Sequence, residues 1–303
     1  MRRMPDPSHL PPRRKSTPGL HPPLAGRKAL SKHPRQWRIS TSLLHCRSFS
    51  PSTMSNDSLP VVAIVGGSSG IGLAVAQRLA SAPRHLHLAA RDATRLEARA
   101  GELGADFRAL DARDSAAVEA WLDEVHTRHG RLDGVVNCAG SILLKPAHLL
   151  TDQEFADTLA LNLTTAFNVL RSAARRMMRQ PGGGSIVLLS SVAARRGLIN
   201  HEAIAAAKAG VEGLALAAAA SYARQGVRVN CVAPGLTRTD LSRNLTQNEA
   251  VAKASAALHP LGRLGEATEV ASAICWLLDR EQSWVTGQVI GVDGGLGSIQ
   301  ARN

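Results

Sequence analysis

The chain has 303 residues, of which 44% are hydrophobic and 3% are aromatic. This composition excludes a disordered or collagen-like chain and supplies enough apolar residues for a core. The net charge is +12, but residues 1–58 carry eleven Lys or Arg and two acidic residues, which leaves only +3 for the remainder. Because that remainder is nearly neutral and poor in aromatics, we expect no nucleic-acid partner.

Cysteine and tyrosine usage narrows the chemistry further. The four cysteines show no CxxC spacing, so we expect reduced thiols in an intracellular protein and no metal site. No stretch of 18 uncharged apolar residues occurs, and we therefore expect no membrane-spanning segment. Tyr222 is the single tyrosine of the sequence, so a mechanism that requires a tyrosine must use this one.

Residues 1–58 form a basic segment that holds nine of the fifteen prolines. Such a composition, rich in Pro and Ser, predicts a disordered extension that does not pack as a domain. The segment resembles a mitochondrial transit peptide, with Arg47–Ser50 similar to a matrix-protease cleavage site, and the protein is then mitochondrial. Alternatively, translation starts at Met54, the upstream residues are an untranslated leader and the protein is cytoplasmic. A functional basic tail is the third interpretation.

From residue 59 onward, short β-branched runs alternate with longer segments of helical period. Strands are predicted near residues 60–65, 85–90, 105–110, 132–137, 184–190, 226–231 and 288–292. Helices are predicted near residues 70–81, 92–102, 114–129, 151–179, 201–224 and 266–280. This alternation predicts one α/β domain over residues 59–303, with a doubly wound, Rossmann-like, parallel seven-stranded sheet. We expect its ligand at the carboxyl ends of the strands, where the strand order reverses.

The first predicted strand, Val61–Val65, runs directly into a glycine-rich turn and then a helix. Glycines let the backbone approach a pyrophosphate, which the free N–H groups of a helix N-terminus then stabilise. The spacing of Gly66, Gly70 and Gly72 differs from G-x-G-x-x-G and resembles the TGxxxGIG signature of the short-chain dehydrogenase/reductase family.

Further residues extend this resemblance, in the expected order, over residues 60–295. They are Asp111, Asn137-Cys138-Ala139-Gly140, Asn162, Ser191, Lys208, Pro234-Gly235, Thr237, Thr239 and Asp293-Gly294-Gly295. The resemblance implies that Ser191, Lys208 and Asn162 are catalytic. The cofactor-binding residues that it implies are Gly66, Ser68, Ser69, Gly70, Ile71, Gly72, Arg91, Asp111, Asn137, Ala139, Gly140, Lys208, Pro234, Gly235, Thr237 and Thr239. The run Pro260-Leu261-Gly262-Arg263 is most similar to the 3-oxoacyl-carrier-protein reductase branch.

The end of the second strand indicates which nicotinamide cofactor binds. An acid in place of Ala90 would hold the ribose hydroxyls of NAD, whereas a base accepts the extra phosphate of NADP. Because Arg91 follows this position, we expect NADP(H), with NAD(H) as the alternative. Asp92 could hold a ribose diol, although we interpret it as the cap of the next helix.

Position 204 departs from the family pattern. The resemblance places a catalytic tyrosine four residues before Lys208, one helical turn away, but this chain has Ile204 there. Tyr222 lies fourteen residues beyond Lys208 and cannot replace it. A positioned general acid contributes about a hundred- to ten-thousandfold to a rate, so its loss would leave slow turnover.

Two side chains are candidates to supply the missing proton. Lys208, near a cationic nicotinamide and partly desolvated, should have a lowered pKa. It could pass a proton through water held by Asn162 to an oxygen that Ser191 positions. His201 lies on the same helical stripe but at the mouth of the pocket, where it could serve a bulky substrate. The third alternative is that catalysis is lost.

The helix around Lys208 also predicts an assembly. Residues 203–223 contain eleven alanines and two charged residues, Lys208 and Glu212. A helix that is apolar on nearly all sides is buried on more than one face. We therefore expect a homodimer or homotetramer, which the family resemblance also implies.

Together, these features predict an NADP(H)-dependent oxidoreductase that transfers hydride between nicotinamide and a small carbonyl or hydroxyl substrate. A 3-oxoacyl thioester is one candidate. The alternative is a catalytically impaired NADP-binding sensor, or a non-catalytic subunit of a mixed oligomer. Residues 241–259 are expected to form the lid, but their composition does not identify the substrate.

Overall fold

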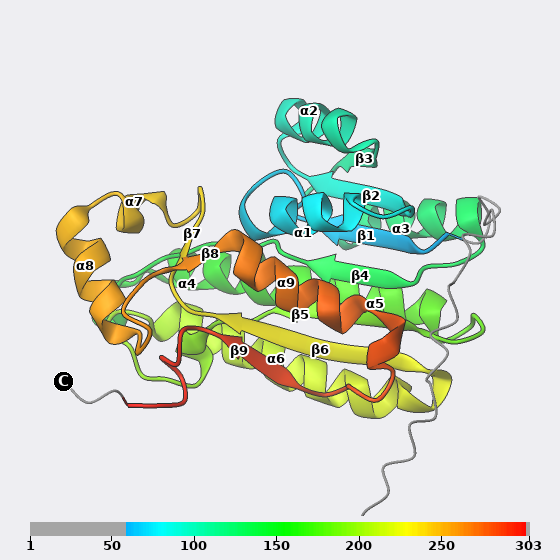
Figure 1. Ribbon diagram of the computed structural model, residues 1–303. Coiled ribbons are helices and arrows are strands. Elements are labelled where there is room, and N and C mark those ends of the chain that lie inside the picture. Colours follow the sequence, from blue (N-terminus) through cyan, green and yellow to red (C-terminus); the bar gives the residue numbers. More distant parts are fainter. Residues whose placement is uncertain (1–58, 301–303) are drawn as a thin grey trace, which may run out of the picture. The chain divides into compact units, whose positions relative to one another are not determined.

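The computed structural model describes residues 59–300 (Figure 1). The predictions for residues 1–58 lie outside the described residues. Residues 59–300 contain a seven-stranded parallel sheet in the order β3-β2-β1-β4-β5-β6-β9. This order confirms the predicted doubly wound, Rossmann-like α/β fold.

The strands of this sheet coincide with the seven predicted ones. Their bounds are β1 Val61–Val65, β2 His85–Ala90, β3 Asp106–Ala109, β4 Gly134–Asn137, β5 Gly184–Leu189, β6 Val227–Pro234 and β9 Val289–Val292. The central strands are apolar on both faces, as expected where helices cover a parallel sheet on both sides. A separate ladder that was not predicted pairs β7 (Thr237–Arg238) with β8 (Gly265–Glu266).

Helices cover both faces of the sheet (Figure 1). Their bounds are α1 Gly70–Ala80, α2 Ala93–Leu103, α3 Ser115–His129, α4 Asp152–Leu159, α5 Thr165–Met177, α6 Glu202–Tyr222, α7 Arg243–Thr246, α8 Glu249–Leu258 and α9 Ala267–Leu278. Short 3₁₀ turns lie at Ala147–Leu149, Val192–Ala194, Ala223–Gln225 and Arg280–Gln282. One apolar cluster joins α1, α2 and α9 to one face, and the other joins α3, α5 and α6 to the opposite face.

Side-chain caps determine where several helices begin. Asp92 accepts a hydrogen bond from the Arg95 N–H at 3.0 Å and caps α2, as the sequence predicts. Asp114 caps α3 in the same way. Thr151 and Glu154 form a reciprocal capping box at α4. Each cap satisfies backbone N–H groups that the first helical turn leaves without a partner.

The helix predicted over residues 151–179 is interrupted by a π turn at Ala160–Thr164. The Thr165 N–H donates to the Ala160 carbonyl, five residues back, so the turn holds one residue more than an α-helical turn. Asn162 lies in this turn and is buried. The irregularity therefore coincides with one of the predicted catalytic residues.

One helical stretch within residues 59–300, Glu202–Gln225, is long and apolar enough to cross a membrane by length and composition. Nearly half of it is buried inside the fold, and α6 packs on β6 beside the buried Val211 and Ala215. We interpret it as a core helix of the α/β sandwich, in agreement with the sequence-based expectation of no membrane-spanning segment.

Candidate functional site

A groove of about 660 Å³ lies at the carboxyl ends of β1, β2 and β4, where the strand order reverses. This is where the doubly wound topology predicts a ligand. The predicted cofactor residues that line it are Gly66, Ser68, Ser69, Gly70, Ile71, Gly72, Arg91, Asp111, Ala139, Gly140 and Thr239. Most of the predicted cofactor site therefore forms one continuous surface.

The glycine turn between β1 and α1 depends on the absence of side chains. A Cβ on Gly72 would lie 2.2 Å from the Gly66 carbonyl oxygen, which no side chain tolerates. Gly66 itself has φ of +80°. The N-cap residue Ser69 makes no side-chain capping hydrogen bond, so it leaves the first N–H groups of α1 to other acceptors. The turn is thus suited to receive a phosphate at a helix N-terminus.

Charged side chains surround the end of the groove that lies beyond β2 and β3. Arg91 is exposed and lines the groove. Asp111 also lines it, and the guanidinium of Arg113 binds its carboxylate at 2.6 Å and 2.9 Å. This hydrogen bonding holds the pKa of Asp111 below its usual value, so the carboxylate stays ionised.

Asn137 contributes to this site indirectly, since it does not line the groove. Its Oδ1 accepts from the Ala139 N–H at 3.2 Å, and its Nδ2 faces Thr165 Oγ1 at 3.4 Å. The side chain is buried at the end of β4. Asn137 therefore shapes the turn after β4, which carries Ala139 and Gly140 into the groove.

A smaller pocket of about 130 Å³ adjoins the groove and shares Gly140 and Thr239 with it. The predicted residues that line this pocket are Ser191, Lys208, Asn162, Ile71, Ala139, Gly140, Pro234, Gly235, Thr237 and Thr239. The fold thus brings the three principal catalytic candidates together, although they come from the turn after β5, from α6 and from the π turn.

Lys208 is buried at the base of this pocket, where its Nζ donates to the main-chain oxygen of Leu189 at 2.8 Å. Burial lowers the pKa of Lys208 from 10.5 to about 8. Its ammonium form still predominates at pH 7, but it releases a proton far more readily than an exposed lysine. Burial raises the pKa of the neighbouring Cys138 thiol to about 12, so Cys138 stays protonated.

Asn162 fixes the loop that follows β4. Its Oδ1 accepts from the Ser141 N–H at 3.2 Å, and its Nδ2 donates to Ser141 Oγ at 3.0 Å and to the Thr158 carbonyl at 2.9 Å. A Cβ on Gly140 would lie only 2.9 Å from Asn162 Oδ1. Because both side-chain N–H groups are engaged, Asn162 acts here as a positioning residue.

Position 204 offers the pocket no hydroxyl. Ile204 is 5% exposed and contributes an apolar wall one helical turn from Lys208. His201 is not among the pocket-lining residues, and its Nδ1 lies 2.7 Å from the Ile199 carbonyl oxygen. Tyr222 packs against the apolar core at the end of α6, which leaves it outside the pocket.

Two polar side chains support the pocket without belonging to a recognised motif: Ser242 lines it, whereas His259 lies outside it and holds Leu236. Ser242 donates to the Thr237 carbonyl and lies 3.1 Å from Thr239 Oγ1, which joins the start of the predicted lid to β7. His259 is buried, and its Nε2 accepts from the Leu236 N–H at 3.2 Å. Both contacts depend on how the chain folds back after β6, and a sequence motif does not encode this path.

The chain is similar to known proteins over most of its length. The family described as enoyl-(acyl carrier protein) reductase matches residues 65–297. The 3-oxoacyl-[acyl-carrier-protein] reductase MabA of Mycobacterium avium is 35% identical over 238 residues, which cover 78% of this chain and 89% of MabA. A short-chain type dehydrogenase/reductase from Mycobacterium ulcerans has a TM-score of 0.76 at 34% identity, covering 80% of this chain and 92% of that one. ElxO with NADP bound has a TM-score of 0.75 at 28% identity, covering 80% of this chain and all of ElxO.

A parallel doubly wound sheet with a glycine turn at its switch point defines the Rossmann-like class of α/β proteins. Within this class, the matches over about four-fifths of the sequence are decisive. The chain belongs to the short-chain dehydrogenase/reductase family, whose members are oxidoreductases that use nicotinamide cofactors.

Proposed function

We propose that this protein is an NADP(H)-dependent oxidoreductase that acts on a small carbonyl or hydroxyl compound. The observation that carries the proposal is the shared pocket of Ser191 and Lys208 directly beside a groove suited to a dinucleotide. Because MabA is named a 3-oxoacyl reductase, a 3-oxoacyl thioester is the first substrate to test.

The groove fits a dinucleotide because its phosphate end is a backbone cradle. A Cβ on Gly72 would fill this cradle, and Ser69 leaves the N-terminus of α1 without a side-chain cap. Asp111 stands at the opposite, adenine end of the groove. Gly235 and Thr237 stand in the neighbouring pocket, where the nicotinamide end would lie.

The preference for NADP(H) rests on Arg91. This exposed guanidinium lines the groove, where it can pair with a 2′-phosphate. Asp92, the residue that would favour NAD, already caps α2 through the Arg95 N–H. Arg95 and Asp240 form an ion pair at 3.3 Å on the same rim, so together they add no net charge and Arg91 carries the preference.

Residues of the pocket bind the substrate oxygen and supply the proton that it takes up. The Ser191 Oγ accepts from the Ala193 N–H at 3.2 Å, so its hydroxyl hydrogen is available to bind the substrate's carbonyl oxygen. Lys208, with its pKa lowered to about 8, releases a proton to that oxygen through water. The Leu189 carbonyl holds the ammonium in place. NADPH, when bound, supplies the hydride.

A second candidate function rests on Ile204. An apolar wall where the family has a tyrosine is compatible with a catalytically impaired NADP sensor or a non-catalytic subunit. The presence of Ser191 beside Lys208 favours the enzyme, since a sensor that binds NADP can use Lys208 but has no need of the serine hydroxyl. The two functions differ in one measurable respect, namely turnover.

The test of the reductase is a substitution that adds a hydroxyl group at position 204. Ile204→Tyr places a phenol one turn from Lys208 and is expected to raise carbonyl reduction at least about tenfold, toward the lower end of what a general acid supplies. NADPH oxidation is measured with purified protein against a carbonyl panel that includes acyl thioesters. Ile204→Phe is the matched control, because it adds the ring without the hydroxyl and is expected to bring no gain.

The outcomes separate the two functions. Turnover by the parent protein that rises in Ile204→Tyr and not in Ile204→Phe supports the reductase. Tight NADPH binding by parent and tyrosine variant, without turnover of any carbonyl, contradicts the reductase and supports the sensor or partner-subunit function.

We also propose that the protein self-associates through α5 and α6, because members of its family are commonly oligomeric. The outward side of α6 presents Gly213, Leu216 and Ala217 to solvent, and Leu216 is 62% exposed. Phe167 on α5 is exposed as well. An exposed apolar helix face of this kind suits close helix packing between two copies of the chain. Light scattering of the full chain is expected to report a dimer or tetramer.

A further inference from the structure

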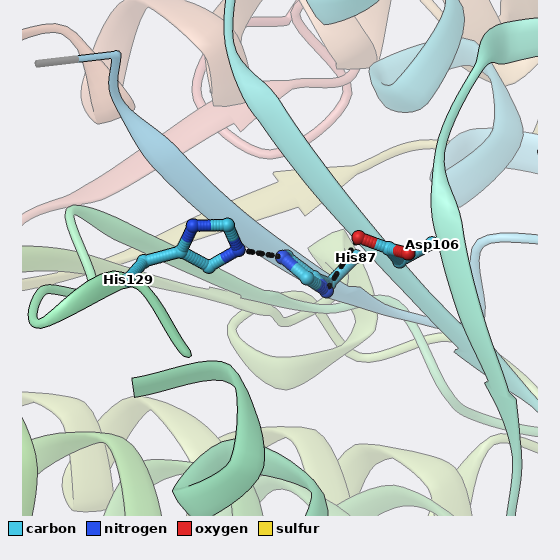
Figure 2. Close-up of side chains that lie close together, drawn as sticks. All are labelled: His87, Asp106 and His129. Atoms are coloured by element: carbon cyan, nitrogen blue, oxygen red, sulfur yellow. Dashed lines mark hydrogen bonds and ion pairs between the residues drawn. The ribbon is translucent and has the colours of Figure 1, made fainter. Parts of the chain in front are cut away.

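Three metal-binding side chains from separate segments meet on the face of the sheet that α3 covers (Figure 2). His87 lies in β2, Asp106 begins β3 and His129 is the last residue of α3. His87 and Asp106 are register partners in neighbouring parallel strands, so their side chains leave the same face of the sheet. None of the three lines the groove or the pocket described above.

His129 and Asp106 contact the two different nitrogens of the His87 ring (Figure 2). His87 Nε2 and His129 Nε2 lie 2.9 Å apart, and the Asp106 carboxylate is 3.7 Å from His87 Nδ1. One ligand atom from each residue nevertheless lies within 4.8 Å of the others. Two nitrogens on one tetrahedral Zn²⁺ are about 3.3 Å apart, given Zn–N bonds of about 2.0–2.1 Å. A small opening of the imidazole pair, with a turn of the Asp106 carboxylate toward it, therefore creates room for an ion.

Hydrogen bonding and stacking restrict the two imidazoles. In the 2.9 Å contact one Nε2 carries a hydrogen, so an ion that binds both Nε2 atoms requires that hydrogen to leave for Nδ1 or for solvent. The ring of His85 stacks on His129 with centroids 4.3 Å apart, which restricts how His129 can turn.

One positive group opposes an ion at this place. Arg128 pairs with Asp106 at 3.1 Å and competes for its carboxylate. The Arg128 side chain is 59% exposed, so it can move into solvent when the carboxylate turns toward an ion. Asp106 is itself about half exposed, which allows that turn.

We propose that His87, His129 and Asp106 form a binding site for a divalent transition-metal ion of the Zn²⁺ type. Two imidazoles and a carboxylate suit Zn²⁺, whereas Ca²⁺ and Mg²⁺ prefer oxygen ligands alone. The bound ion ties the edge strand β3 and its neighbour β2 to the end of α3. These strands carry Arg91 and Asp111 just beyond their carboxyl ends, so the ion braces the adenine side of the groove from the opposite end of the strands.

The test is a calorimetric titration of the full chain with ZnCl₂, compared between parent and variants. His87→Gln and His129→Gln are each expected to lose one equivalent of bound Zn²⁺, or to weaken it at least about tenfold. Asp106→Asn should weaken it less. His126→Gln is the control, because His126 lies on the same helix outside the cluster and should leave binding unchanged.

A second variant gives a result that a merely structural role cannot produce. Arg128→Gln removes the competing cation and is expected to tighten Zn²⁺ binding, while the thermal stabilisation by Zn²⁺ persists. If the buried His87→Gln fails to fold, the partly exposed positions His129 and Asp106 still decide the outcome. Zn²⁺ stoichiometry and affinity that stay at the parental values in His129→Gln and Asp106→Asn would overturn the proposal.

Discussion

The groove proposed to bind the cofactor adjoins the pocket that holds Ser191 and Lys208, and Gly140 and Thr239 line both. They differ in how many of the functional groups expected from the sequence each one contains. The groove keeps its glycine turn, an exposed base at Arg91 and an ionised carboxylate at Asp111. The pocket contains Ser191 and Lys208 and has an apolar wall at Ile204, the position where the family resemblance implies a tyrosine.

This difference teaches that binding and proton transfer are separable in the fold. The groove is built largely from backbone and from helix and strand ends, so it survives changes inside the pocket. The pocket depends on individual side chains, so a single substitution there can remove a proposed catalytic group. Changes at Ser191 or Ile204 should therefore affect turnover and leave NADPH affinity nearly intact, whereas a change in the groove, such as at Arg91, should weaken NADPH binding.

The largest effect is expected from Lys208→Ala. Without a tyrosine, Lys208 is the remaining group that can release a proton in the pocket, so its loss should lower carbonyl reduction about a hundred- to ten-thousandfold. NADPH oxidation and NADPH affinity are measured together. The control is Lys253→Ala on the exposed face of α8, which should match the parent. If His201→Ala lowers the rate and Lys208→Ala does not, the proton comes from His201 instead.

A smaller effect is expected from Arg91→Ala. Loss of one charge-assisted contact should weaken NADPH binding about ten- to a hundredfold and leave NADH nearly unchanged. Fluorescence titration of both nucleotides provides the measurement. Equal losses of affinity for the two nucleotides would show that Arg91 does not contact the 2′-phosphate. Tighter binding of NADH than of NADPH by the parent would indicate that Asp92, and not Arg91, determines the cofactor preference.

The smallest effect is expected from pH. The Lys208 ammonium predominates below about pH 8 and can donate, while the neutral amine accumulates above it. Carbonyl reduction should therefore fall about tenfold for each pH unit above 8, and alcohol oxidation, which needs a proton acceptor, should rise. Buried thiols do not interfere, because burial raises the pKa of Cys138 and Cys231 to about 12. A pH step that persists in Lys208→Ala would contradict this assignment.

The sequence predicts the fold closely because its signals are local. Short β-branched runs such as Val61–Val65 and the cap at Asp92 lie within a few residues of what they specify. The glycine turn is predicted for the same reason, since Gly66 and Gly72 meet within one loop. The π turn at Ala160–Thr164 is not foreseen, because helical period alone does not reveal an extra residue.

The site is predicted less completely, because its contacts join distant segments. Ser191 and Lys208 are found through family resemblance, but the hydrogen bond from Lys208 to Leu189 depends on how α6 packs on β5. The approach of His87 to His129 spans 42 residues and follows no recognisable motif. Cysteine spacing is a local signal for metals, whereas a cluster of this kind appears only once the strands are paired.

The π turn has a consequence for how the active site can change. One extra residue rotates the helix by about 100°. The side chain of Asn162 in this turn donates to the Thr158 carbonyl, and the same side chain also donates to Ser141 Oγ. The Asn162 side-chain amide thus stabilises both the helix and the loop that follows β4. Its effect on stability and its effect on the pocket therefore cannot be altered independently. Asn162 is a point where a gain in one property is tied to a loss in the other.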